Sequence, residues 1–330
     1  MENNSHEEIQ QSPPVTKLPF NNLFLNAGFV DGQNKFWMYV MGITATIGGY
    51  FLMQFVTILP LVARAIDKGV TTTELINNQH IIFDSNRLEI DKNWILLAQF
   101  GLFVGAFAMF YMVIKYIHRK QFLSVVTGYD KFRYKHFFFA FGIWAAILIF
   151  TVLVTYFTSS TNDLVVQFDL PRFLVLFFIC IIFLPIQTLC EEVIFRSYLI
   201  QGFSQVCKNG IMPVVITSVM FGLAHMSNPE TRAFGMGIML SYYIIFAFFL
   251  GAITLLNEGL ELAFGIHLAN NFISALTVTS QTAVLKTDAI FYAKSEDAGA
   301  ELVIAFCAII VVFVVFWFKF KWKNFSLLIK

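Results

Sequence analysis

The chain has 330 residues, of which 58% are apolar and only 13% charged, and its mean hydropathy is +0.70. A soluble domain usually carries about 25% charged residues, so this composition excludes an ordinary water-soluble protein and indicates lipid as the solvent. The formal net charge of +1 gives no support to a nucleic-acid partner. The four cysteines show no paired spacing, which argues against a disulfide framework or a CxxC metal site.

The N-terminal segment is polar and contains Ser12-Pro13-Pro14. Its first 20 residues lack the apolar core of a secretory signal peptide. We therefore expect residues 1–35 to form a flexible cytoplasmic tail, and we expect the following segments to anchor the protein.

Eight segments further along the chain are apolar enough to be read as membrane spans. A spanning helix needs about 20 mostly apolar residues, and these segments meet or nearly meet that length. The sequence therefore predicts an all-α, multi-pass transmembrane helix bundle. The segments are Phe36–Leu61, Trp94–Ile117, Phe137–Phe157, Phe173–Leu189, Ile211–His225, Phe234–Leu256, Leu262–Val284 and Leu302–Phe318.

Lysine and arginine gather in two places outside these segments. The loop between the second and third segments holds five of them, and Lys115 just before it is a sixth, against one acid, Asp130. The C-terminal tail adds Lys319, Lys321, Lys323 and Lys330 with no acid. Basic loops face the cytoplasm, and eight spans place both basic regions on one side. We therefore expect both termini to be cytoplasmic.

Charged side chains in the later segments begin with Glu191-Glu192 and Arg196. Such residues are costly in a bilayer and usually functional. On a helix, Glu192 and Arg196 lie four residues apart on one face and can pair, while Glu191 points about 100° away. The alternative to a functional site is that these charged residues lie at the end of a helix, where they contact water at the membrane boundary.

His225 follows the turn Lys208-Asn209-Gly210, which predicts an antiparallel helical hairpin. Counted from that turn, Glu191 and His225 reach depths within roughly 5 Å of each other. The fourth segment is therefore expected to continue through Glu191 toward Val206. A lone histidine at the end of a span is more often a packing residue. However, His225 lies at the same depth as a buried carboxylate on the adjoining helix, which favours a functional site.

His267 and Asn271 are also four residues apart and share a helix face. Hydrogen bonding between helices in lipid is the ordinary reason for such a pair. However, the three helices together carry two carboxylates, two histidines and an amide. This combination favours a functional site assembled from all three helices.

In this order and spacing the motifs resemble those of the type II CAAX prenyl protease and bacteriocin-processing (Abi) family of intramembrane proteases. One departure is Ser197, where the family usually has glycine, and we expect its hydroxyl to bond back to the helix backbone. The motifs are Glu-Glu-x-x-x-Arg at Glu191–Arg196, Phe-x-x-x-His at Phe221–His225 and His-x-x-x-Asn at His267–Asn271.

The resemblance covers roughly residues 170–285, which would form the family core. Residues 36–169 would add three variable helices, and residues 286–330 a final helix with a basic tail. The resemblance implies that Glu191 is the general base that activates a water, that Glu192 and Arg196 orient it, and that His225 helps to hold the water.

His267 and Asn271 would complete a metal site or stabilise the oxyanion. A zinc site would use Glu191, His225 and His267, with one open position. The chain has no His-Glu-x-x-His helix, and Asn271 is a poor zinc ligand but a good oxyanion donor. We therefore expect no cofactor, with zinc as the alternative.

The expected function is that of an intramembrane endopeptidase acting on a membrane-associated protein or peptide. A catalytically silent scaffold or immunity protein with the same fold is the alternative. A transporter is disfavoured because no inverted repeat or pair of broken helices is visible. The expected location is a bacterial plasma membrane, and neither the substrate nor the oligomeric state is legible from the sequence.

Overall fold

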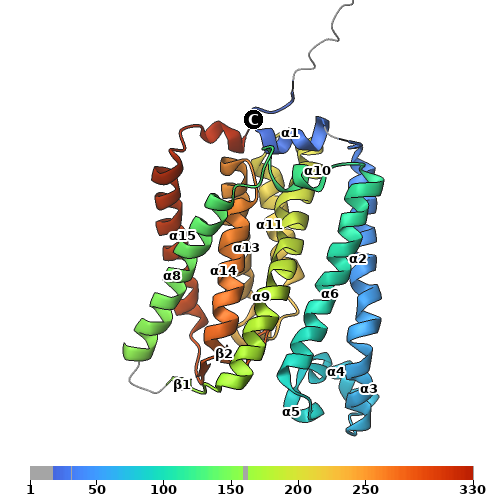
Figure 1. Ribbon diagram of the computed structural model, residues 1–330, viewed down its shortest axis with the longest axis vertical. Helices are drawn as coiled ribbons and strands as arrows, with labels where there is room; N and C mark the ends of the chain where they lie inside the picture. The colour runs from blue at the N-terminus through green and yellow to red at the C-terminus, as the bar shows by residue number, and fades with distance from the viewer. Residues whose placement is uncertain (1–17, 31, 159–162, 330) are drawn as a thin grey trace, which may run out of the picture.

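The computed structural model describes residues 18–30, 32–158 and 163–329. Helices make up 76% of the structure and run along the long axis of the molecule (Figure 1). In chain order the elements are α1 (Leu23–Val30), α2 (Phe36–Thr57), α3 (Leu59–Asp67), α4 (Thr72–Asn77), η1 (Gln79–Phe83), α5 (Ser85–Leu88), α6 (Lys92–Met112), η2 (Val113–Ile117), α7 (Phe122–Val126), α8 (Tyr134–Thr158), β1 (Leu164–Val166), α9 (Leu170–Glu192), η3 (Val193–Tyr198), α10 (Leu199–Cys207), α11 (Ile211–Ala224), α12 (Pro229–Phe234), α13 (Met236–Asn257), α14 (Glu261–Thr277), β2 (Val278–Ser280), β3 (Phe291–Ala293), α15 (Ala298–Phe320) and η4 (Phe325–Leu328).

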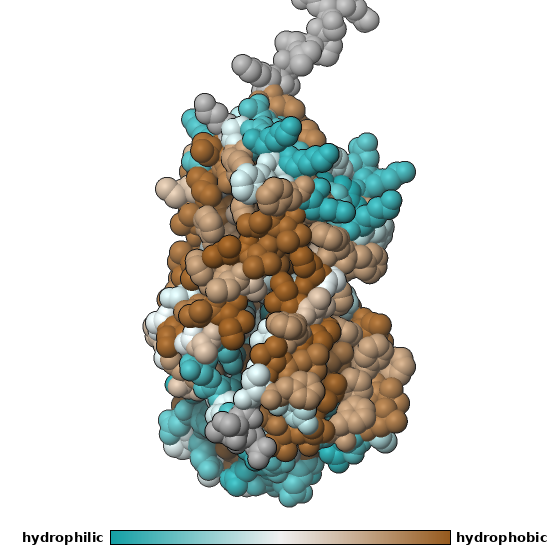
Figure 2. Space-filling model, turned by 90° about the vertical axis from the view of Figure 1, so that its left-hand side faces the viewer, coloured by the Kyte–Doolittle hydropathy of each residue, from teal (hydrophilic) through white to brown (hydrophobic). Residues whose placement is uncertain are grey.

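Six helical stretches of the described chain are long and apolar enough to cross a membrane. Their outward faces are apolar, as on α9, where Phe178 and Ile182 are exposed. Figure 2 shows a broad apolar belt between two polar ends on the face that carries α8 and α15. A multi-pass membrane protein is thereby confirmed. The stretches are Phe36–Asp67, Lys92–Ile117, Tyr134–Thr158, Leu170–Cys207, Met236–Asn257 and Ala298–Phe320.

Two of the eight expected spans are helical but shorter than a bilayer core. Helix α11 has 14 residues and α14 has 17, so they extend about 21 and 26 Å against a core of about 30 Å. The expected end of the seventh span at Val284 is wrong, because α14 ends at Thr277. The β-branched residues Val278 and Thr279 that follow favour extended backbone, and strand β2 begins there.

A small three-stranded sheet in the order β1-β3-β2 departs from the expected all-α fold. Strand β3 pairs antiparallel with β1, with Val165 opposite Tyr292. It pairs parallel with β2, with Thr279 opposite Tyr292. Because β1 precedes α9 and β2 follows α14, the sheet connects the two helices that carry most of the predicted site residues.

Part of the expected flexible tail is folded. Residues 1–17 lie outside the described part of the chain, but α1 is a packed helix in which Phe24 and Leu25 are fully buried. Its backbone is held from α10 by the Gln201 side chain, whose Nε2 donates to the Phe24 carbonyl at 3.0 Å. The apolar run in α1 explains this correction, since it covers α10 rather than facing water.

The described ends of the chain lie at the same end of the bundle (Figure 1). The Asn22 side chain donates to the carbonyls of Leu255 and Leu327, at 2.9 and 3.3 Å. The basic loop before α8 lies there too, since Lys120 Nζ donates to the Ala27 carbonyl at 2.6 Å. Both described ends of a chain lie on the same side of a membrane when the chain crosses it an even number of times.

Helix α14 is fixed against α8 in two ways. Gly265 lets the helices approach closely, because a Cβ there would lie 2.5 Å from the Phe137 carbonyl oxygen. At one end, Arg133 binds the fully buried carboxylate of Glu261 with two hydrogen bonds, of 3.0 and 2.7 Å. Arg133 also donates to the Asn257 carbonyl at 2.7 Å, and the Asn257 amide donates to Glu261 at 3.1 Å.

Candidate active site

The helix that carries Glu191 and Glu192 continues without a break from Leu170 to Cys207, as the sequence predicted. Directly after Glu192 the backbone adopts the π-helix η3. Such π-bulges insert an extra residue into a helix and occur frequently at functional sites. The helix ends at Cys207, and the left-handed conformation of the next residue, Lys208 (φ 54°), starts the predicted turn.

Glu192 is completely buried and binds two of the other predicted residues. Its Oε1 accepts a hydrogen bond of 2.7 Å from His267 Nδ1 and lies 3.2 Å from Arg196 Nη1. The predicted pairing of Glu192 with Arg196 is thereby confirmed. Because a carboxylate only accepts, the proton of neutral His267 is on Nδ1, and Nε2 presents a lone pair.

Arg196 is held by an aromatic ring as much as by charge. The guanidinium lies 3.9 Å from the centroid of the Phe221 ring, within range of a cation–π interaction. Its ion pair with Glu192 lacks hydrogen-bond geometry. Within the described structure, the three guanidinium nitrogens and Glu192 Oε2 are buried without a hydrogen-bond partner, so Arg196 acts here as a buried positive charge.

Glu191 faces a different neighbour from Glu192, as expected for adjacent residues on a helix. Its Oε1 accepts a hydrogen bond of 2.7 Å from the Nε2 of Gln187, one turn earlier. Its Oε2 lies 3.6 Å from His267 Nε2. That distance is too long for a direct hydrogen bond, and it leaves both atoms facing each other across a gap.

Asn271 lies beside this gap, one turn after His267. Its Nδ2 donates to Gln187 Oε1 at 3.1 Å and lies 3.4 Å from His267 Nε2. Its neighbour Asn270 donates to Asn271 Oδ1 at 3.3 Å, and the Trp144 indole on α8 donates to Asn270 Oδ1 at 3.2 Å.

His225 immediately follows α11, where its Nδ1 donates to the Phe221 carbonyl at 2.7 Å. Its ring centroid lies 4.2 Å from that of Phe221 and 4.5 Å from that of Tyr243. The Phe221 ring is also 6.1 Å from the His267 ring. Phe221 therefore joins His225 to Arg196 and His267, so the fold brings all six predicted side chains into one cluster.

The donor set does not fit a metal ion in this arrangement. The Nδ1 hydrogen bonds of the two histidines leave both Nε2 atoms as acceptors, which suits a ligand. However, no group of three or more His, Cys, Asp or Glu side chains in the described residues has the spacing to hold a metal. The expected zinc ligands Glu191, His225 and His267 are among these described residues, and they form no such group.

Sequence reasoning missed the supporting residues and placed one contact wrongly. Gln187 was not singled out, although a polar residue one turn before Glu191 in an apolar helix is a visible signal. Phe221 was noted only as part of a motif. The Ser197 hydroxyl donates to the carbonyl of Val125 on α7 rather than to its own helix, because it faces that neighbouring element.

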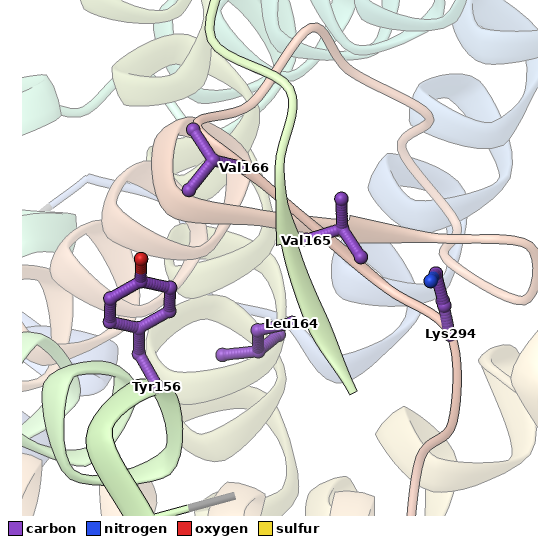
Figure 3. Close-up of a pocket in the computed structure, with 5 residues that line it drawn as sticks. All are labelled: Tyr156, Leu164, Val165, Val166 and Lys294. Atoms are coloured by element: carbon purple, nitrogen blue, oxygen red, sulfur yellow. The ribbon is translucent and has the colours of Figure 1, made fainter. Parts of the chain in front are cut away.

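Two surface cavities lie away from this cluster. One of about 330 Å³ borders strand β1 between Tyr156 and Lys294 (Figure 3). A larger one of about 450 Å³ lies where α6 and α9 begin, between Trp94 and Arg172. Neither is lined by any of the six predicted residues, and no chemistry is assigned to them.

The segment of sequence that carries this buried glutamate and histidine cluster is similar to a known protein family. Residues 171–273, which carry all six predicted residues, match the family model described as type II CAAX prenyl endopeptidase Rce1-like. The resemblance seen in the motifs is therefore confirmed over this segment, which lies within the expected core of residues 170–285.

Among individual proteins, the chain is similar to the uncharacterized protein YyaK of Bacillus subtilis (strain 168). The two are 24% identical over 258 residues, which cover 77% of this chain and 82% of that protein. No solved structure matches this chain. The similarity to YyaK extends well beyond the family-matched segment, so it includes part of the region expected to be variable.

Proposed function

We propose that this protein is an intramembrane endopeptidase that hydrolyses a peptide bond in a membrane-associated protein or peptide, with Glu191 activating the water. The observation that carries the proposal is the gap of 3.6 Å between Glu191 Oε2 and His267 Nε2. The opposite atom of each group is fixed by a hydrogen bond: Glu191 Oε1 accepts from Gln187, and His267 Nδ1 donates to Glu192. Catalytic groups that are fixed in this way need little reorganisation during reaction.

The two facing atoms are both acceptors when Glu191 is ionised and His267 is neutral. A water to one side of these two atoms, within hydrogen-bond distance of both, would donate one O–H to each and present its oxygen lone pair to a carbonyl carbon. As the oxygen–carbon bond forms, the water proton passes to Glu191. When the carbon–nitrogen bond breaks, Glu191 returns that proton to the leaving amine.

The remaining residues have supporting roles in this proposal. Asn271 Nδ2 donates one hydrogen to Gln187, and its second hydrogen would stabilise the oxyanion; His225 would help to hold the water. Glu192 orients His267 through Nδ1, and the charge of Arg196 compensates that of Glu192. Glu191 is then the uncompensated carboxylate of the cluster.

A metal-free mechanism is part of the proposal. It is supported by the spacing of Glu191, His225 and His267, which do not form a metal-holding group, and by the amide at Asn271. Zinc remains the alternative to be tested with a chelator.

We further propose that the chain crosses the membrane eight times, with α11 and α14 as short passes and both termini in the cytoplasm. The arrangement of α1 and η4 at one end supports an even number of passes. The bacterial relative supports a bacterial plasma membrane as the location. The partners would be the lipid bilayer and a membrane-associated protein or peptide substrate.

The test is cleavage of a quenched membrane-peptide library by detergent-purified protein. Wild type is compared with Glu191→Gln and His225→Ala, and with Glu74→Gln as a control that removes an exposed carboxylate. We expect cleavage by wild type and the control, none by the two site variants, and no effect of a chelator.

Two other results would change the assignment. Loss of activity with a chelator and recovery with zinc would replace the metal-free mechanism with the metal mechanism. Absence of cleavage, together with a Glu191→Gln variant that still supports the cellular phenotype, would favour the scaffold or immunity role.

A further inference from the structure

Gln187 lies inside the bundle at 8% exposure, and every polar atom of its side chain has a partner. Nε2 donates to Glu191 Oε1 at 2.7 Å. Oε1 accepts from Asn271 Nδ2 and from Thr188 Oγ1, each at 3.1 Å. A buried amide without partners is costly, and here those partners include the proposed base and the proposed oxyanion donor.

The direction of these hydrogen bonds is set at both ends of a chain of side chains. It begins at the Trp144 indole, which can only donate, and passes through Asn270, Asn271 and Gln187. It ends at Glu191, which can only accept when ionised. Each amide must therefore turn its oxygen toward the previous member and its NH₂ toward the next.

This fixed direction decides what each catalytic group presents to the reaction. Gln187 occupies Oε1 of Glu191, so Oε2 is left facing His267 Nε2. Gln187 also accepts one amide hydrogen of Asn271, which fixes the Asn271 NH₂ toward the same gap. Hydrogen bonds in such a chain polarise one another in a medium of low dielectric.

We propose that Gln187 is a positioning residue that couples the base Glu191 to the oxyanion donor Asn271, an inference that rests on the proposed function. The primary amide of Gln187 donates to the carboxylate and accepts from Asn271 at once, and an aliphatic side chain can do neither. A leucine of similar size would fill the same space and break both connections. Catalysis would then suffer while the helix remained packed.

The test compares Gln187→Leu with Gln201→Leu in purified full-length protein. Gln201 is another buried glutamine on the same continuous helix, but it donates to the Phe24 carbonyl, away from the cluster. Hydrogen bonds to charged groups contribute about 1.5–3 kcal/mol. We therefore expect Gln187→Leu to lower kcat about 10- to 100-fold, with little change in KM. Gln201→Leu should lower only the unfolding temperature.

A double-mutant cycle with Asn271→Leu separates coupling from simple loss of packing. If the two side chains act as one unit, the double variant should be hardly worse than the worse single variant. An unchanged kcat in Gln187→Leu, or effects that multiply independently in the double variant, would overturn the inference.

An infrared measurement keeps this inference separate from the proposed function. The carboxylate band lost in Glu191→Gln identifies Glu191, and this band should shift in Gln187→Leu but not in Gln201→Leu. Absence of turnover in wild type would refute the proposed endopeptidase alone. An unshifted band would overturn the positioning role of Gln187, whether or not the protein cleaves peptides.

Discussion

The ion pair between Arg133 and Glu261 sets where α14 begins, and therefore the position of the helix that carries His267. Glu261 is fully buried and the Arg133 side chain is 21% exposed. We expect Arg133→Met to leave the carboxylate with two neutral donors, the Asn257 amide and the backbone N–H of residue 133. Loss of one partner of a buried pair costs about 3–5 kcal/mol. The lower end, about 3 kcal/mol, applies here because two neutral donors remain and Arg133 is partly exposed.

The assay is denaturant unfolding in detergent, with two comparisons. The double variant Arg133→Met, Glu261→Met should lose clearly less than Arg133→Met, because no buried charge is left unpaired. Arg87→Met is the control, since its pair with Glu74 is exposed and 3.8 Å long, and it should change stability by at most about 1 kcal/mol. A loss below about 1 kcal/mol in Arg133→Met, or a double variant as unstable as the single, would refute this reasoning.

Two further outcomes concern α12 and the α8–α14 contact. Burial, followed by the charges of Glu301 and Glu296, raises the pKa of Glu230 from 4.5 to about 7. The folded state therefore binds this proton more tightly, and the stability it contributes below about pH 4.5 is lost as the pH rises through 7. Glu230→Gln should raise the unfolding temperature at pH 8 and not at pH 4, and an equal gain at both would contradict this cause. Gly265→Ala should separate α14 from α8 and cost about 1–3 kcal/mol in the same unfolding assay, whereas Gly142→Ala, which faces open space, should be neutral or slightly stabilising.

The six predicted residues, which the structure brings into one cluster, could be selected from the sequence because each is a costly group in an apolar segment. Their helical spacing also predicts the contact of Glu192 with Arg196, which the structure contains. The continuation of the helix through Glu191 followed from the turn at Lys208-Asn209-Gly210. These inferences need only the geometry of single helices and of one hairpin.

The supporting contacts depend on which helix faces meet, and no local pattern encodes that. Gln187 is seen to connect Glu191 with Asn271 only after α9 and α14 are packed together. The π-helix after Glu192 depends on backbone bonds that composition does not reveal. The end of α14 at Thr277 and the folding of α1 were missed for a related reason. In both places, contacts with distant parts of the chain decide the local structure, and the pattern of apolar residues does not show those contacts.

Helix α11 has a consequence for the surrounding lipid. Its exposed side chains, such as Val215, Val219 and Leu223, form an outward apolar stripe, yet the helix extends only about 21 Å. Hydrocarbon about 30 Å thick must thin beside it or admit headgroups and water. The same helix leads directly into His225. If the cluster hydrolyses peptides as proposed, its supply of water depends on membrane thickness, and bilayers of longer or shorter acyl chains should change the turnover rate of the unaltered protein.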